Sequence, residues 1–221
     1  MLILCVHDVV TADPDSVWAV TEDELAAVLG ACTRQGYEFI TLDRLSDATA
    51  SSAVLTADDG RSGAVSWLLR KAPELGVSAT AFVVPGWIDD PERMPEGERY
   101  SRIATWDEVA ALRDAGHALG SHGMTHVRLP SQTGEQMTAE IRDSKDLIQS
   151  VTGSTVRHFS APYGRISDAV IRETRHAGYE TVSTTMPGVN GPDERRTGIL
   201  RRLLLRRDLP NLGLPREWGP W

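Results

Sequence analysis

The sequence contains only two cysteines and no long uninterrupted run of apolar residues. Cys5 and Cys32 form no C-x-x-C pattern, which argues against a disulfide framework and against a cysteine-based zinc or redox motif. No stretch approaches the roughly 18 apolar residues of a membrane-spanning helix. The apolar start at residues 1–6 has no basic region before it and runs directly into charged residues, unlike an export signal. We therefore expect a cytoplasmic protein without a membrane span.

Positive charge is also scarce, because 23 Lys and Arg stand against 31 Asp and Glu, for a formal net charge of -8. Nucleic acid is therefore not a predicted partner, since phosphate binding needs a clustered excess of basic residues. A length of 221 residues with 41% hydrophobic residues suits one globular core, so we expect a single catalytic domain over residues 1–221. The tail at 208–221 lacks periodicity and is expected to run over the surface.

Short apolar runs alternate with amphipathic segments, which is the pattern of βα units that build a parallel sheet. Strands are predicted at residues 2–6, 38–42, 53–56, 78–84, 117–121, 156–160 and 179–184. Helices are predicted at residues 22–35, 64–75, 105–115, 135–152 and 167–177. This alternation predicts an α/β fold, a distorted (β/α)7 barrel with parallel strands. The proline-rich and charged stretch 85–102 is expected to be a long loop that frames a site.

Two adjacent carboxylates, Asp58 and Asp59, stand where the predicted strand 53–56 runs into a glycine turn, within LTADDG at residues 55–60. Catalytic groups of βα barrels gather at such strand ends. Adjacent carboxylates repel unless something positive lies between them, and a metal could bind one while the other acts as a base. Taken alone, Asp-Asp-Gly is equally an ordinary turn and helix start.

Two histidines, His122 and His126, follow the predicted strand 117–121 within GSHGMTH at residues 120–126. Histidines four residues apart can converge on one ion, and neutral imidazole suits Zn²⁺. Such a pair often arises by chance. Combined with the two carboxylates at another strand end, it predicts an Asp-His-His metal site with a position left open for water.

A third strand end carries FSAPYG at residues 159–164, where Pro-Tyr-Gly forces a tight turn. A turn of this kind could direct the backbone N–H of Tyr163 into the site to stabilise an oxyanion. The alternative is a simple connection from a strand to a helix.

These three segments, in this order, resemble the polysaccharide deacetylase family, carbohydrate esterase family four. The family patterns T-F-D-D-G, H-[ST]-x-x-H and R-x-P-x-G correspond to residues 56–60, 122–126 and 160–164, and the resemblance covers about residues 1–190. It implies a distorted barrel of about seven βα units and a divalent metal, with Zn²⁺ as the expected ion. By the same resemblance, the metal ligands are Asp59, His122 and His126, Asp58 is the general base, and the Tyr163 amide faces the oxyanion.

Two departures from the family pattern concern catalysis. Ser160 stands where the family has an arginine that orients the base, and no histidine follows His176, although the family generally supplies its catalytic acid near the C-terminus. The opening LCVHDV at residues 4–9 resembles the start of the circularly permuted branch, in which the first strand carries that histidine. The resemblance then implies His7 as the acid, although a lone histidine there can also be a packed or surface group.

An arginine inside an otherwise apolar segment offers a replacement for the missing motif arginine. The segment LRRLLL at residues 200–205 resembles a C-terminal arginine segment of the permuted branch, and we hypothesise that Arg202 stands near Asp58. The alternative interpretation of this basic run is a solvated strand edge.

These residues predict an enzyme that hydrolyses an N-acyl group, expected to be N-acetyl, from an amino sugar. The amino sugar is either a small molecule or part of an oligosaccharide, and metal-bound water is the expected nucleophile. A deformylase or a cyclic-amide hydrolase is the alternative enzyme, because fold and metal site fix the bond type better than the acyl group. The departures at Ser160 and at the C-terminal histidine leave open a catalytically weakened, carbohydrate-binding member of the family.

Overall fold

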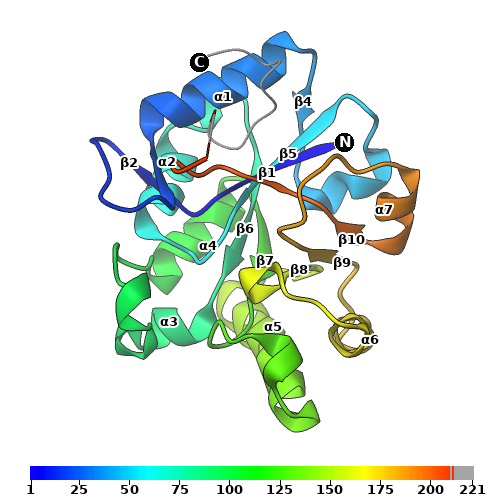
Figure 1. Cartoon of the computed structure of the whole chain (residues 1–221). Coiled ribbons are helices and arrows are strands. Elements are labelled where there is room, and N and C mark those ends of the chain that lie inside the picture. The colour runs from blue at the N-terminus through cyan, green and yellow to red at the C-terminus, as the bar shows by residue number, and fades with distance from the viewer. Residues whose placement is uncertain (210, 212–221) are drawn as a thin grey trace.

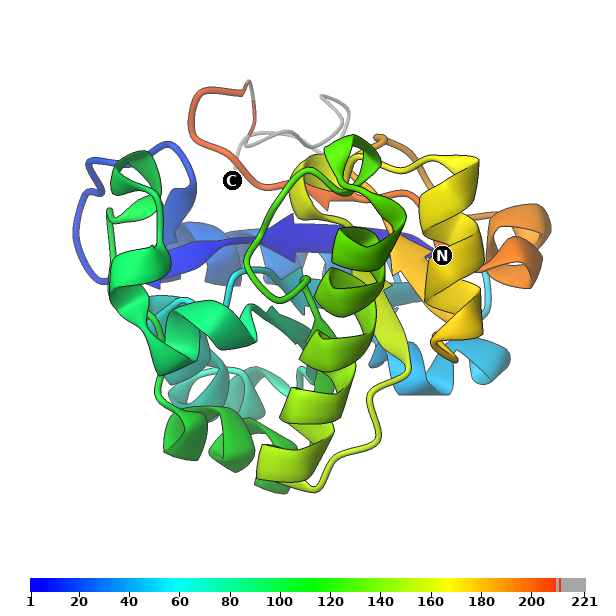
Figure 2. The same ribbon diagram turned by 90° about the horizontal axis from the view of Figure 1, so that it is seen from below.

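The chain folds into one curled sheet of parallel strands surrounded by helices, as Figures 1 and 2 show from two directions. The computed structural model describes residues 1–209 and 211. The sheet has the strand order β10-β9-β8-β7-β6-β5-β1-β11, with β4 paired to β5 beside this path, and a small second sheet pairs β2 with β3. The predicted α/β fold with a distorted barrel of parallel strands is confirmed.

The strands of the described chain are β1 (Leu2–Val6), β2 (Asp8–Val10), β3 (Ala19–Thr21), β4 (Glu38–Phe39), β5 (Ser52–Ala57), β6 (Ala79–Val83), β7 (Ala118–Ser121), β8 (His158–Ser160), β9 (Thr181–Ser183), β10 (Ile199–Leu200) and β11 (Leu203–Leu204). The helices are α1 (Glu22–Arg34), α2 (Ser62–Arg70), α3 (Pro85–Asp89), α4 (Trp106–Asp114), α5 (Gly134–Thr152), α6 (Asp168–His176) and α7 (Pro192–Thr197). Short 3₁₀ helices span Leu42–Asp47, Pro73–Leu75, Pro91–Arg93, Glu96–Glu98, Leu129–Ser131 and Pro162–Gly164.

Most predicted elements are present within a few residues of their expected bounds, and three predictions need correction. The predicted helix 64–75 ends at Arg70, because Pro73 cannot continue the hydrogen-bonding pattern and starts a 3₁₀ turn instead. The predicted strand 38–42 is reduced to two residues. The stretch 85–102 is not a plain loop, since it contains α3 and two 3₁₀ turns.

Two very short strands lie at the two ends of the strand order, at or beside the apolar segment at residues 200–205 and outside the seven predicted strand ranges. β10 pairs with β9, at one end of the strand order, and β11 pairs with β1 near the other end. Only Arg201 and Arg202 separate these two strands in the sequence. Residues 199–204 therefore connect the two edges of the sheet, and Arg202 lies at the point of closure.

The side chains of each strand alternate between the inside of the barrel and the outer core that packs against the helices. Ile3 of β1 and Val54 of β5 belong to a small inner cluster, whereas the flanking Leu2, Leu4 and Leu55 belong to the large core against the helices. Because successive side chains of a strand point to opposite faces, the inner series of β1 continues through Cys5 and that of β5 through Thr56. Parallel pairing sets Cys5 beside Thr56, so residues that follow these strands meet at one end of the barrel.

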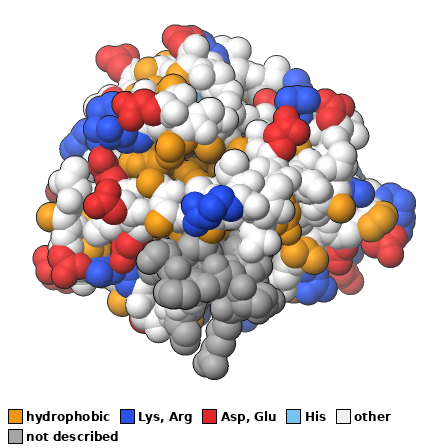
Figure 3. Space-filling model, turned by 90° about the horizontal axis from the view of Figure 1, so that it is seen from above, with side chains coloured by type: hydrophobic (Ala, Val, Ile, Leu, Met, Phe, Trp, Pro, Cys, Tyr) orange, Lys and Arg blue, Asp and Glu red, His pale blue; other side chains and the backbone are white. Residues whose placement is uncertain are grey.

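The predicted surface tail lies mostly outside the described residues, which omit 210 and 212–221. No helix of the described chain is long and apolar enough to cross a bilayer. Figure 3 shows one face of the molecule, on which acidic and basic side chains intersperse along the margins while apolar side chains gather nearer the middle. Charges of both signs thus share this face.

Gly120 of β7 allows close packing next to the strand end that carries His122. A Cβ atom built at Gly120 would lie 2.4 Å from Phe82 Cδ1 and 2.9 Å from the His158 carbonyl oxygen. We predict that Gly120→Ala lowers the free energy of unfolding by about 1–3 kcal/mol through overpacking, measured by urea denaturation. The control is Gly134→Ala at the start of α5, where a Cβ meets open space and the change should stay within about 0.5 kcal/mol. Equal stability of the two variants would contradict this account of the packing.

Candidate metal centre and active site

The three predicted metal ligands converge at the carboxyl ends of β5 and β7. The Nε2 atoms of His122 and His126 each lie 3.6 Å from Asp59 Oδ1. One ligand atom from each of the three residues lies within 4.8 Å of the others, and all three side chains are buried. The separation is well below the roughly 6 Å beyond which one ion could not be shared.

The protonation of the two imidazoles suits cation binding. His122 Nδ1 lies 2.7 Å from the Ser160 carbonyl oxygen, which can only accept a hydrogen bond, so this nitrogen carries the proton and Nε2 keeps its lone pair. Burial, followed by the neighbouring His122, lowers the pKa of His126 to about 4. The His126 ring is therefore neutral at neutral pH, and His122 directs Nε2, not Nδ1, toward Asp59.

Asp59 uses its two carboxylate oxygens differently. Oδ2 accepts hydrogen bonds from Nε and Nη2 of Arg61, both at 3.2 Å, whereas the buried Oδ1 has no hydrogen-bond partner. A buried carboxylate oxygen without a donor is costly in free energy. A cation between Oδ1 and the two Nε2 atoms would compensate this cost, so the residues present fit a divalent metal ion.

Strained backbone conformations gather at this site. Asp59, His126 and Tyr163 have positive φ angles of 71°, 59° and 59°, a conformation that residues other than glycine rarely adopt. Such strain persists only where the surrounding structure imposes it, and it concentrates at functional sites. Here it occurs after β5, β7 and β8, at the same end of the barrel.

Arg202 occupies the position that the sequence analysis hypothesised, against Asp58. The guanidinium forms a two-point ion pair, with Nη1 2.7 Å from Oδ1 and Nη2 2.8 Å from Oδ2. The Ser160 hydroxyl completes the arrangement, because it donates to Asp58 Oδ2 at 3.1 Å and accepts from Arg202 Nη2 at 2.9 Å. The Ser160 hydroxyl therefore contacts both members of the Asp58–Arg202 ion pair.

The ion pair keeps Asp58 ionised. Burial alone would raise the pKa of Asp58, but the charge of Arg202 brings this pKa well below its usual range. The carboxylate is consequently available as a proton acceptor at neutral pH.

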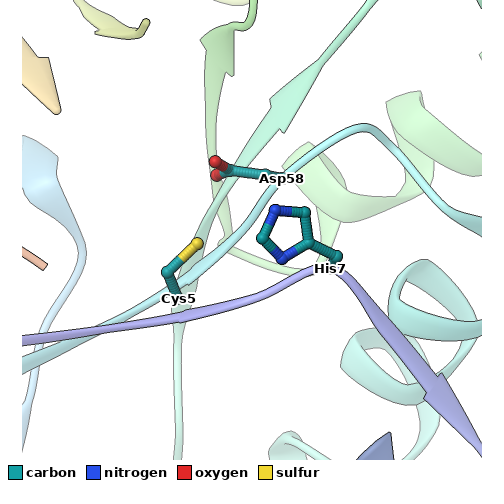
Figure 4. Close-up of side chains that lie close together, drawn as sticks. All are labelled: Cys5, His7 and Asp58. Carbon is teal, nitrogen blue, oxygen red and sulfur yellow. The ribbon is translucent and has the colours of Figure 1, made fainter. Parts of the chain in front are cut away.

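His7 lies beside Asp58 and Cys5 at the barrel end, as Figure 4 shows. Its half-buried ring packs against the indole of Trp18, with ring centroids 4.7 Å apart. Burial lowers the pKa of His7, although the nearby Asp59 and Asp58 act in the opposite direction. His7 is therefore neither a surface group nor packed in the apolar core.

Cys5, His7 and Asp58 form a second group of possible metal ligands by distance alone. Two observations argue against that use. Burial raises the pKa of the Cys5 thiol well above its ordinary value, so it stays protonated, and Arg202 already neutralises the carboxylate of Asp58. Of the two groups, Asp59 with the two histidines is the better candidate.

A cavity of 240 Å³ opens over these residues. It is lined by His7, Trp18, Asp58, Glu98, His122, His126, Ala161, Tyr163, Gly164, Thr185, Leu204 and Arg206. The Tyr163 ring is partly exposed there and packs on the ring of His126 at a centroid distance of 4.6 Å. A substrate in the cavity would meet the predicted base, acid and metal ligands together.

The sequence analysis missed Arg61, which is fully buried beside the metal site. It follows the Asp-Asp-Gly turn directly, so the one available signal was an arginine two residues after a predicted metal ligand. Because arginine is mostly found exposed at the surface, this signal did not distinguish the residue.

Comparison with known proteins agrees with the geometry. The family model of the polysaccharide deacetylases matches residues 46–182. The chain is 33% identical over 90 residues to a chitooligosaccharide deacetylase of Azorhizobium caulinodans, covering 40% of this chain and 43% of that protein. It is 24% identical over 140 residues to a peptidoglycan-N-acetylmuramic acid deacetylase of Bacillus subtilis, covering 62% and 48%. The chain spans about half the length of these curated relatives or less.

Solved structures share the fold over nearly the whole chain. The protein IcaB from Ammonifex degensii has a TM-score of 0.81 at 21% identity, covering 94% of this chain and 92% of that one. The deacetylase PplD of Streptococcus pyogenes, solved with acetate, has a TM-score of 0.80 at 19% identity and covers 100% and 98%. At these identities the likeness establishes the fold.

The ion pair of Arg202 with Asp58 makes a prediction about stability. Arg202→Met keeps most of the side-chain volume but leaves a buried carboxylate unpaired, so the free energy of unfolding should fall by about 3–5 kcal/mol. Arg44→Met is the matched control, because it removes an ion pair with Asp47 that is about 60% exposed, and such pairs contribute about 0–1 kcal/mol. Denaturant unfolding measures both. A similar loss in the two variants would show that Asp58 does not depend on Arg202.

Proposed function

The chain belongs to the polysaccharide deacetylase family, and from this premise we propose that it hydrolyses the N-acetyl group of an amino sugar with the help of a divalent metal ion. The observation that carries the proposal is the convergence of Asp59 Oδ1 with two imidazole nitrogens at 3.6 Å. The same oxygen is buried and has no hydrogen-bond donor of its own. We also propose that residues 1–221 act as one catalytic domain.

Asp59, His122 and His126 would hold the metal. Two imidazoles and one carboxylate, with room for a further ligand, are a donor set typical of catalytic Zn²⁺, and we propose Zn²⁺ as the ion. When bound, the ion would supply Lewis-acid chemistry by lowering the pKa of a water molecule and polarising the acyl carbonyl.

Asp58 is proposed as the general base. Its carboxylate lines the cavity, stays ionised beside Arg202, and lies with Oδ2 3.6 Å from His122 Nε2. It would accept a proton from the attacking water. Arg202 and Ser160 would act as positioning residues, because their three contacts fix both oxygens of the carboxylate.

Tyr163 and His7 would act on the tetrahedral species and its breakdown. Tyr163 lies in a left-handed turn, and we propose that its backbone N–H donates a hydrogen bond to the developing oxyanion. A well-placed donor of this kind lowers the activation free energy by about 3 kcal/mol. His7, protonated for this step, would donate a proton to the departing amine as the carbon–nitrogen bond breaks. The products are acetate and the free amino sugar, which balances the consumption of one water.

The position of His7 supports the permuted branch of the family. β1 lies between β5 and β11 in the sheet, so its end is adjacent to the strand end that carries Asp58. A histidine on the first strand can therefore serve where other members of the family use one near the C-terminus. This geometry supports an active rather than a weakened member, because His7 and Arg202 both lie beside Asp58, where we expect the two missing side chains to act.

The substrate is proposed to be a single N-acetylated amino-sugar unit, free or within an oligosaccharide. The relatives named above act on chitooligosaccharide and on peptidoglycan, which share such units. The cavity of 240 Å³ is below the roughly 300–1,000 Å³ of pockets for drug-sized ligands, which favours one sugar unit at the reacting position.

Single substitutions separate metal binding from proton transfer. Asp59→Ala should lose both the metal and activity, because it removes a ligand. Asp58→Asn should retain the metal while kcat falls by about 10²–10⁴-fold, since only the base is lost. Metal content by elemental analysis and turnover by acetate release measure the two effects. Full metal occupancy in Asp59→Ala, or wild-type turnover in Asp58→Asn, would contradict these roles.

A substrate screen tests the reaction itself. Protein loaded with Zn²⁺ should release acetate from N-acetylated amino sugars of one or more chain lengths, whereas chelator-treated protein should not until metal is restored. Formate release from N-formyl analogues, run in parallel, measures the alternative deformylase activity. The deacetylase proposal fails if metal-loaded protein releases acetate from none of the sugars tested.

A further inference from the structure

Arg61 is bonded to a predicted metal ligand and to the segment that covers it. Its side chain is completely buried at the start of α2, two residues after Asp59. Nε and Nη2 both donate to Asp59 Oδ2 at 3.2 Å. Since a carboxylate has only two oxygens, this leaves Oδ1 alone to face His122 and His126.

Hydrogen bonds and an aromatic ring restrain the guanidinium group of Arg61, so that it stays against Asp59. Nη1 donates to the Glu98 carbonyl oxygen at 2.5 Å and contacts Met94 Sδ at 3.6 Å, while Nη2 also contacts Glu98 Oε2 at 3.3 Å. The ring of Tyr100 packs on its face, with its centroid 4.0 Å from Cζ. All five N–H groups of the side chain therefore have partners.

The backbone of Arg61 is anchored to the same segment. It forms an isolated antiparallel bridge with Ile103, and the neighbouring Ala104 N–H donates to the Gly60 carbonyl at 2.9 Å. Residues 94–104 thus pack around one arginine whose remaining donors reach the metal site. An arginine that served only to stabilise this segment would not need to donate twice to one oxygen of Asp59, next to His122 and His126.

We propose that Arg61 is a positioning residue that makes Asp59 a one-oxygen metal ligand, by occupying Oδ2 and fixing the orientation of Oδ1. The inference rests on the proposed metal-dependent function. Groups that orient a metal ligand in this way typically change metal affinity about 10–100-fold when removed. By excluding two-oxygen coordination, Arg61 would preserve a coordination position for water and substrate.

Charge and orientation make opposite contributions, which allows them to be separated. The positive charge of Arg61 repels a cation, so its removal alone would strengthen metal binding. Arg61→Lys keeps the charge but replaces the rigid two-donor arrangement by one flexible ammonium group. A fall in affinity in this variant therefore reports lost orientation, and Arg61→Met then tests the loss of both charge and donors.

The test measures Zn²⁺ affinity by competition with a chromophoric chelator and coordination by the visible absorption of the Co²⁺-substituted protein. Arg61→Lys and Arg61→Met should bind Zn²⁺ roughly 10–100-fold more weakly than wild type. Their Co²⁺ absorption should weaken, as expected when a second carboxylate oxygen raises the coordination number. Arg44→Met is the matched control, because Arg44 is exposed and pairs with Asp47 rather than with a metal ligand or the segment 94–104, so neither readout should change.

The outcomes separate this inference from the function on which it rests. Failure of wild-type protein to bind either metal would overturn the proposed function and the inference together. Normal metal binding by wild type, with unchanged affinity and spectrum in Arg61→Lys, would overturn the inference alone. Circular dichroism and thermal unfolding monitor folding, and if Arg61→Met does not fold, Arg61→Lys decides the question.

Discussion

Two adjacent carboxylates are buried side by side at the end of β5, and each is only 2% exposed. Neither could stay ionised there without its own positive or hydrogen-bonding partner. Asp58 pairs with Arg202. Asp59 accepts hydrogen bonds from Arg61 on Oδ2, and its Oδ1 faces the imidazoles of His122 and His126. In a continuing strand these neighbours would point to opposite faces. The left-handed conformation of Asp59 breaks that alternation and brings both side chains to the same site.

The closure of the barrel determines how Asp58 is held. Residues 199–204 join the two edges of the sheet through β10 and β11, and the interruption between these strands carries Arg202 inward. Ser160 on β8 is small enough for the guanidinium to lie against its hydroxyl, at 2.9 Å. An arginine at position 160 would add a second cation beside the first. Ser160 and Arg202 are therefore one arrangement around Asp58, in which the cation comes from the segment between β10 and β11.

The order of strands explains how chemistry from distant parts of the chain meets. β1 lies between β5 and β11, so His7 reaches Asp58, while β7 and β8 bring the histidines and the Tyr163 turn to the same end. All the main strands are parallel, and their carboxyl ends therefore share one rim. The segment 94–104 completes the site from outside the sheet, because Arg61 connects it to Asp59.

The amino-acid sequence by itself determined the type and order of most elements and the residue types of the metal site. Those features are local: hydrophobic periodicity identifies strands and helices, and the segments at residues 55–60 and 120–126 each lie within a few positions. The sequence suggested that Arg202 lies near Asp58, but the two-point geometry of this pair, the contacts of Ser160 and the burial of Arg61 were decided only by the tertiary structure. Arg202 and Asp58 are 144 positions apart, and their contact depends on how the sheet closes. The closing strands have two residues each, too few to produce a periodic pattern, so no local signal encodes that closure.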